Sequence, residues 1–103
     1  MSSPQPEYRL AYHGIVGKQL SECLKALHAA GWEKEMLVSI LKEAESRLKR
    51  DPSSCGEPIF NIRALDMVVW VFYVRPFSIR FGLQEKTRTV LVRGISLMTL
   101  TEI

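Results

Sequence analysis

The apolar positions in the first half of the chain recur at the spacing of helices. Between Val16 and Ala30 most apolar residues fall three or four positions apart, which predicts one amphipathic helix that ends before Gly31. A second run predicts a helix from about Glu33 to Arg50, which Asp51-Pro52 stops. The first apolar stripe comprises Val16, Leu20, Cys23, Leu24, Leu27 and Ala30, and the second comprises Met36, Leu37, Ile40, Leu41, Ala44 and Leu48. These stripes predict a helical hairpin over residues 14–50.

After residue 66 the pattern changes to that of strands. Met67 to Val74 is an unbroken apolar run rich in β-branched and aromatic residues, and Phe77 to Leu83 alternates apolar with polar residues. A polar turn at Gln84–Thr87 leads into a third strand, Arg88 to Arg93, which Ile95 to Leu100 could extend. The second half of the chain therefore predicts three consecutive strands.

Other segments frame these elements. Tyr8 to Tyr12 predicts a short strand, whereas the prolines within residues 1–7 predict a flexible tail. Residues 53–58 are rich in turn formers, and Ile59 to Leu65 is apolar but fits neither period. The expected architecture is a single α+β domain over residues 8–103, in which an N-terminal two-helix hairpin packs on a C-terminal antiparallel sheet.

A two-residue turn at Arg75-Pro76 sets the register of the first hairpin. It pairs Val74 with Phe77, Phe72 with Ile79, Trp70 with Phe81 and Val68 with Leu83, all on one face. A four-residue turn at Gln84–Thr87 adds Val90 opposite Phe81 and Val92 opposite Ile79 on that face. The residues expected to be buried are Trp70, Phe72, Phe77, Ile79, Phe81, Val90 and Val92 on the strands, with Leu20, Leu24, Leu27, Leu37, Ile40 and Leu41 on the helices.

The opposite face of the predicted sheet carries the candidate site. In the same register Tyr73 lies across from Ser78, Ser78 lies across from Arg93, and Arg80 lies beside them. Two guanidinium groups beside a phenol and a hydroxyl could hold a phosphate, because arginine presents a fixed fork of donors. The phosphate-binding candidates are therefore Tyr73, Ser78, Arg80 and Arg93, although these residues also fit an ordinary solvated sheet face.

Three apolar residues on that same face would form an exposed strip, namely Val69, Val71 and Leu91. An exposed apolar strip is more often covered by another protein than left in water. We therefore expect a partner chain to bind there, either a different protein or a second copy in a homodimer.

Charge and composition narrow the function only slightly. The net charge is +3, and from residue 61 onward six basic residues outnumber three acidic ones, which places the basic excess on the sheet. Cys23 and Cys55 are isolated, and His13 and His28 lie at no metal-ligand spacing, so no metal and no other cofactor is expected. The chain has neither a membrane-length apolar run nor a signal-peptide pattern, which predicts a cytoplasmic protein that does not bind membranes.

The order of the elements resembles that of the RelE/ParE superfamily of small bacterial toxins. The similarity is carried by the hairpin Gly14–Arg50, the passage DPSSCGEPIFNIRAL and the segment VVWVFYVRPFSIRFGLQEKTRTVLVRGI, and it covers about residues 8–100. The resemblance implies a RelE/ParE-like domain that is the toxin, or a toxin-like component, of a toxin–antitoxin pair. Its partner would be a cognate antitoxin protein.

The resemblance also implies a target and a mechanism. RelE-like members cleave messenger RNA on the ribosome, whereas ParE-like members inhibit DNA gyrase. By their strand positions, Arg80 and Arg93 are the residues that would carry catalysis in a RelE-like enzyme. This chain departs from that pattern, because the second strand, VVWVFYV, holds no lysine and Ser96 stands where a basic or histidine residue is expected. Ribonuclease chemistry would then lack its proton carriers, and a non-catalytic protein-interaction module is the alternative function.

Overall fold

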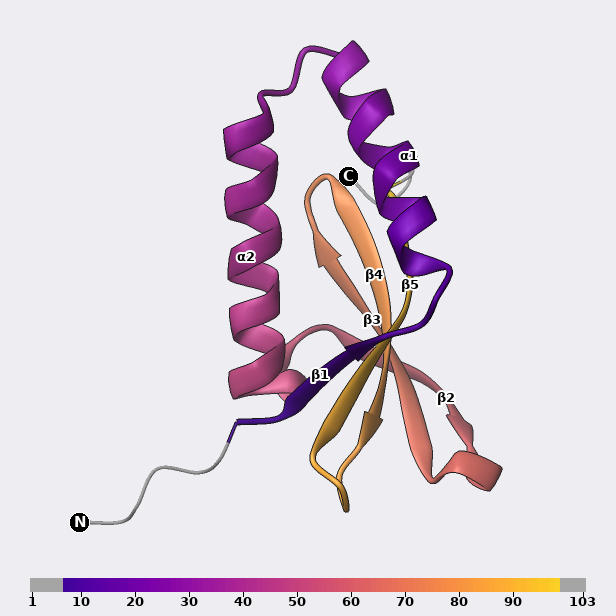
Figure 1. The fold of residues 1–103 in the computed structure, drawn as a ribbon. Helices are drawn as coiled ribbons and strands as arrows, with labels where there is room; N and C mark the ends of the chain where they lie inside the picture. The colour runs from indigo at the N-terminus through magenta and orange to yellow at the C-terminus, as the bar shows by residue number, and fades with distance from the viewer. Residues whose placement is uncertain (1–6, 99–103) are drawn as a thin grey trace, which may run out of the picture.

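A computed structural model describes residues 7–98 of the chain (Figure 1). In chain order the elements are β1 (Arg9–Tyr12), α1 (Val16–Ala29), α2 (Lys34–Arg50), the short 3-10 helix η1 (Pro52–Ser54), β2 (Glu57–Ile62), a second 3-10 helix η2 (Arg63–Leu65), β3 (Met67–Val74), β4 (Phe77–Gln84) and β5 (Thr89–Leu97). The predicted helical hairpin is confirmed, and Gly31 follows α1 with the expected left-handed backbone. Of the tail expected at residues 1–7 only Glu7 is described, and an extension of the last strand to Leu100 lies partly outside the described residues.

The five strands form one mixed sheet in the order β1-β5-β4-β3-β2. β1 runs parallel to β5, with Arg9 opposite Thr89, whereas the other neighbouring strands are antiparallel. The prediction of an antiparallel sheet is therefore wrong at this edge. Parallel neighbours need a long connection, and the one between β1 and β5 contains both α-helices and the other strands. The apolar segment Ile59 to Leu65 fitted neither the helical nor the strand period, and its first four residues form most of β2, the opposite edge strand.

The register of the β3–β4 hairpin is as predicted. Arg75 and Pro76 form its two-residue connection, and all four predicted pairs, from Val74–Phe77 to Val68–Leu83, are present. A slip of one residue would turn the charged side chain of Arg80 into the core, so the apolar pattern permits a single register.

The β4–β5 hairpin departs from its predicted register. Its turn lies one residue later than expected, at Glu85–Arg88, so that Leu83 and not Phe81 lies opposite Val90. Arg88 adopts a left-handed backbone (φ 46°), and its N–H donates to the carbonyl of Glu85 at 3.1 Å. Moving the turn by one residue moves the register by two, which leaves each side chain on its predicted face.

A bulge in β5 adds a second difference. Phe81 lies opposite Val92 and Arg80 lies opposite Gly94, which leaves Arg93 as the extra residue between them. The next core residue of β5 is consequently Ile95, three positions after Val92, and it is 5% exposed.

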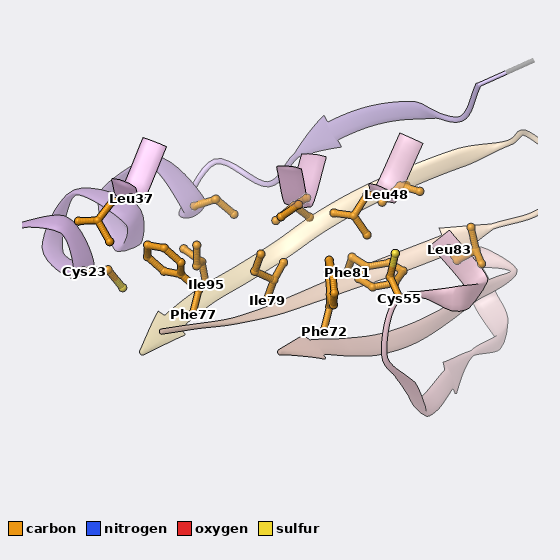
Figure 2. Packing of buried hydrophobic residues seen from close by; sticks show 14 of the residues in the cluster. Cys23, Leu37, Leu48, Cys55, Phe72, Phe77, Ile79, Phe81, Leu83 and Ile95 are labelled. Atoms are coloured by element: carbon orange, nitrogen blue, oxygen red, sulfur yellow. The ribbon is translucent and has the colours of Figure 1, made fainter. Parts of the chain in front are cut away.

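The core lies between the two helices and one face of the sheet (Figure 2). Buried as predicted are Phe72, Phe77, Ile79, Phe81, Val90, Val92, Leu27 and Leu37. Trp70, Leu20, Leu24, Ile40 and Leu41 are only partly buried, and Met36 and Ala30 of the predicted stripes are exposed. Cys23 and Cys55 are free thiols at opposite ends of the core, and burial raises the pKa of both (Figure 2). No helix within residues 7–98 has the length and apolar character to cross a membrane.

Two polar contacts fasten the helices to the edge of the sheet. The Tyr12 hydroxyl of β1 donates to the Glu45 carboxylate of α2. The Gln19 side chain of α1 accepts a hydrogen bond from the backbone N–H of Ile95 at 2.9 Å. β1 ends at Tyr12, so Gln19 supplies an acceptor to the part of β5 that has no strand on that side.

Candidate functional site

The candidate site lies on the sheet face opposite the helices, which we call the open face. Both α-helices pack on the other face (Figure 2). In the observed register the open face of the three central strands consists of Met67, Val69, Val71 and Tyr73 from β3, Ser78, Arg80 and Gly82 from β4, and Leu91, Gly94 and Ser96 from β5. On the neighbouring edge strand β2, which pairs antiparallel with β3, Phe60 lies opposite Val69.

Three of the four predicted site residues are neighbours on this face. Tyr73 lies opposite Ser78 as predicted, and Arg80 follows Ser78 on the same side of β4. Tyr73 is 47% exposed and Arg80 is also exposed, so both side chains are accessible. On its other side Ser78 lies opposite Ser96, a hydroxyl that was not among the predicted site residues. The cluster is thus one guanidinium, one phenol and two hydroxyls.

Gly94 determines where the Arg80 side chain lies. A Cβ built on Gly94 would lie 3.3 Å from Nη2 and 3.5 Å from Nε of Arg80. The guanidinium therefore lies across the backbone of β5 at a position without a side chain. A larger residue at this position would push the guanidinium away from Ser96 and Ser78.

The predicted place of Arg93 opposite Ser78 is wrong. The register shift and the bulge put Ser96 opposite Ser78 instead. The Nη1 atom of Arg93 lies 3.7 Å from the Met67 sulfur, and Met67 begins β3 whereas Tyr73 lies near its end. Arg93 therefore packs on the Met67 thioether instead of lying beside Ser78.

Met67 also explains why the predicted apolar strip is not exposed. Its side chain occupies the space above Gly82, where a Cβ would collide with the Met67 sulfur. Val69 lies opposite Gly82 and is 1% exposed, so it is already covered within the single chain. Val71 and Leu91 are half-buried. The expectation that Val69, Val71 and Leu91 form an exposed strip is wrong for Val69 and only partly met by the other two.

The exposed apolar side chains lie one strand further on, at the β2 edge. Ile59, Phe60 and Leu65 are each about half exposed, at 50%, 51% and 48%. A bulge lies between Pro58 and Phe60, and Pro58 has no N–H to offer a neighbouring strand. The only sequence signal for this surface was an apolar segment that matched neither a helix nor a strand.

The chemistry available to the open-face cluster is the binding of an anion. Tyr73, Ser78, Arg80 and Ser96 offer positive charge and hydrogen-bond donors, and the Tyr73 phenol is the one group among them that belongs to the usual proton carriers. Within residues 7–98 no three histidine, cysteine or acidic side chains gather as a metal site. The cluster is therefore suited to holding a phosphate.

The two tyrosines with shifted pKa values lie away from this cluster, on β1 and directly before it. The hydrogen bond from Tyr8 to Glu85 raises the pKa of the Tyr8 phenol, and the Arg88 guanidinium lies 4.1 Å from the centre of its ring. Burial, followed by the hydrogen bond to Glu45, raises the pKa of Tyr12. These contacts hold β1 against the β4–β5 turn and α2, so we assign them a structural role.

The chain matches no protein-family model and no curated protein. Its function is therefore inferred from its own residues and their arrangement.

Proposed function

We propose that this chain is a RelE/ParE-like, toxin-like component of a toxin–antitoxin pair that binds messenger RNA on the ribosome without cleaving it. The observation that carries the proposal is the position of Arg80, exposed in the middle of the open face and lying across Gly94. DNA gyrase, the target of ParE-like members, is the competing target.

The neighbours of Arg80 suit a nucleic-acid backbone. An arginine fork pairs with phosphate oxygens, and the hydroxyls of Ser78 and Ser96 can donate to the same group. The half-exposed ring of Tyr73 offers a surface on which an unpaired base could stack. The cluster holds no histidine, carboxylate or lysine to exchange protons during attack by a ribose 2′-hydroxyl, so the proposed activity is binding that blocks translation.

Growth arrest on expression tests the proposal. Arg80→Ala should relieve the arrest and weaken binding of a labelled single-stranded RNA, because it removes the only guanidinium in the cluster. Arg63→Ala, which removes an exposed arginine of η2 at the opposite side of the sheet, is the matched control and should change neither property. Both variants should keep the thermal midpoint of the wild type. Absence of arrest by the wild type, or equal arrest by Arg80→Ala, would contradict the assignment.

The target is distinguished by two reactions with purified protein. Inhibition of cell-free translation with intact messenger RNA is the expected result, and inhibition of DNA supercoiling by gyrase would transfer the proposal to the ParE-like target. A short reading frame next to this gene should encode the antitoxin, and its product should restore growth on co-expression.

The second candidate function is a non-catalytic protein-interaction module, which the exposed side chains of β2 favour. Ile59 and Phe60 of β2, a strand with one neighbour, and Leu65 of η2 present apolar surface, in the place of the strip expected on β3 and β5. If the protein causes no arrest but forms a homodimer or a complex that Phe60→Ser abolishes, this function replaces the first.

A further inference from the structure

An apolar groove runs between α1 and α2, on the side of the molecule away from the open face. The two helices diverge from the loop that joins them (Figure 1). One part of the groove, about 530 Å³, is lined by the helices alone, and a second part, about 300 Å³, reaches the sheet residues Ile79, Val92 and Ile95. Leu20, Leu24 and Val38 line both parts, which makes them one continuous depression.

The groove explains why several predicted core residues are only partly buried. Leu20, Leu24 and Leu41 belong to the apolar stripes of the two helices, yet each remains partly accessible because it faces this space. An apolar surface of this size in contact with water is unfavourable, and its burial is the usual driving force for association. The hairpin thus leaves room for one more element on the helical side of the core.

We propose that this groove binds an amphipathic helix of a partner protein, whose apolar side faces the groove and whose margins are acidic. Both walls are helices, and helices satisfy their own backbone hydrogen bonds. An extended peptide would therefore find no free backbone groups here, whereas a third helix needs none and can pack its side chains between those of the walls. From Gly17 to His28 the α1 wall is about 17 Å long at the helical rise, which corresponds to three turns of a partner helix.

The charge of the rim determines the kind of helix. The charged residues beside the leucine-lined part are the exposed lysines Lys25 and Lys34, and Lys42 lines the part next to it. None of these lysines forms an ion pair within residues 7–98, where the ion pair present joins Lys86 to Asp66. The carboxylate that lines the groove, Glu45, already accepts the Tyr12 hydroxyl. Acidic residues at the edges of the partner helix would pair with the lysines and set its orientation.

A set of labelled peptides tests this inference with the purified full chain. The probe is a helix-forming peptide of about four turns with leucines at i, i+3, i+4 and i+7 and glutamates on both flanks. Its controls carry lysines in place of the glutamates, or the same residues in scrambled order. Fluorescence anisotropy should show saturable binding of the acidic peptide, weakening as salt is raised, and at least about tenfold weaker binding of both controls.

Two variants two residues apart on α2 locate the site. Val38→Glu places a charge in the groove and should weaken binding at least about tenfold. Met36→Glu, at a residue that is 52% exposed and does not line the groove, should bind like the wild type. Circular dichroism on both variants establishes that the helices are retained. The double change Lys25→Glu with Lys34→Glu should reverse the preference, so that the lysine-flanked peptide binds better than the glutamate-flanked one.

Other occupants predict different results. If the wild type forms a dimer by light scattering that Val38→Glu dissociates, a second copy fills the groove and the inference is overturned. Equal binding of the acidic and basic peptides, or binding that Val38→Glu does not change, also overturns it. Because growth and RNA binding are not measured, these results are independent of the proposed function on the open face.

Discussion

At the scale of single residues, glycines decide which side chains lie together on the open face. Gly94 lets the Arg80 guanidinium lie across β5, and Gly82 lets Met67 lie across β4. Arg93 then packs on Met67 and does not lie opposite Ser78. Two arginines that look equivalent in the sequence thus have different surroundings, one exposed among hydroxyls and one half-buried on a thioether.

Two stacked aromatic residues should differ in their contribution to stability. The rings of Trp70 and Phe81 lie 6.1 Å apart, but Phe81 is fully buried whereas Trp70 is partly exposed. The Trp70 indole N–H is also buried without a hydrogen-bond acceptor in residues 7–98, which reduces its net contribution. Phe81→Ala should therefore cost about 3–5 kcal/mol and Trp70→Ala clearly less, as urea unfolding can measure. An equal loss for both would show that Trp70 is buried as fully as the sequence predicted.

At the scale of elements, β1 and α1 share the task of covering one edge of the sheet. β1 pairs with β5 only as far as Tyr12 and Val92, and α1 approaches beyond that point. The Gln19 side chain thus accepts a hydrogen bond from the backbone of β5 beyond the point where β1 pairs with that strand.

Removing the Gln19 acceptor should open this edge locally. Gln19→Ala should cost about 1 kcal/mol and accelerate hydrogen exchange of the Ile95 amide, because its N–H would lose its acceptor. Gln19→Glu retains an acceptor and should keep most of the protection. Unchanged exchange at Ile95 in Gln19→Ala would mean that another group satisfies this N–H.

The contact between β1 and α2 should depend on pH. The Tyr12 phenol has a pKa above its ordinary value of about 10 in the folded chain, because burial and the Glu45 carboxylate favour its protonated form. Its stabilising effect is therefore complete below pH 10 and is lost as the pH rises through the folded pKa. Tyr12→Phe should lower the free energy of unfolding by about 1 kcal/mol at pH 8, and this difference from the wild type should shrink at pH 11. A difference that is the same at both pH values would argue against the hydrogen bond.

At the scale of the whole molecule, the sequence predicts local structure better than the arrangement of distant parts. The β3–β4 register was predictable because the apolar alternation admits one solution and Pro76 marks the turn. The β4–β5 turn was placed one residue early because its left-handed residue is Arg88, where glycine or asparagine would have been the usual signal. The bulge at Arg93 and the parallel pairing of β1 depend on contacts across the fold, which a linear pattern does not contain.

These differences had unequal effects on the core and on the site. Displacing the β4–β5 turn kept each side chain on its predicted face of the sheet. The prediction of which residues of β4 and β5 face the core was therefore unaffected by this error. The candidate site depended on which residue stands beside Ser78, and there the displaced turn and the bulge together replaced Arg93 by Ser96. The α1–α2 groove was not foreseen because a helical stripe indicates which residues are apolar and not whether a neighbour covers them.

The pairing of β1 with β5 bears on the order in which the chain can fold during its synthesis. Arg9 and Thr89 are 80 positions apart, so β1 leaves the ribosome long before the strand that holds it exists. The helices also emerge before β3, β4 and β5, the strands that cover most of their apolar sides. Contacts between such distant residues slow folding and prolong the exposure of apolar surface. This exposure favours aggregation and chaperone binding. β1 can therefore pair with its only neighbouring strand in the described sheet after β5 has been synthesised, and not before.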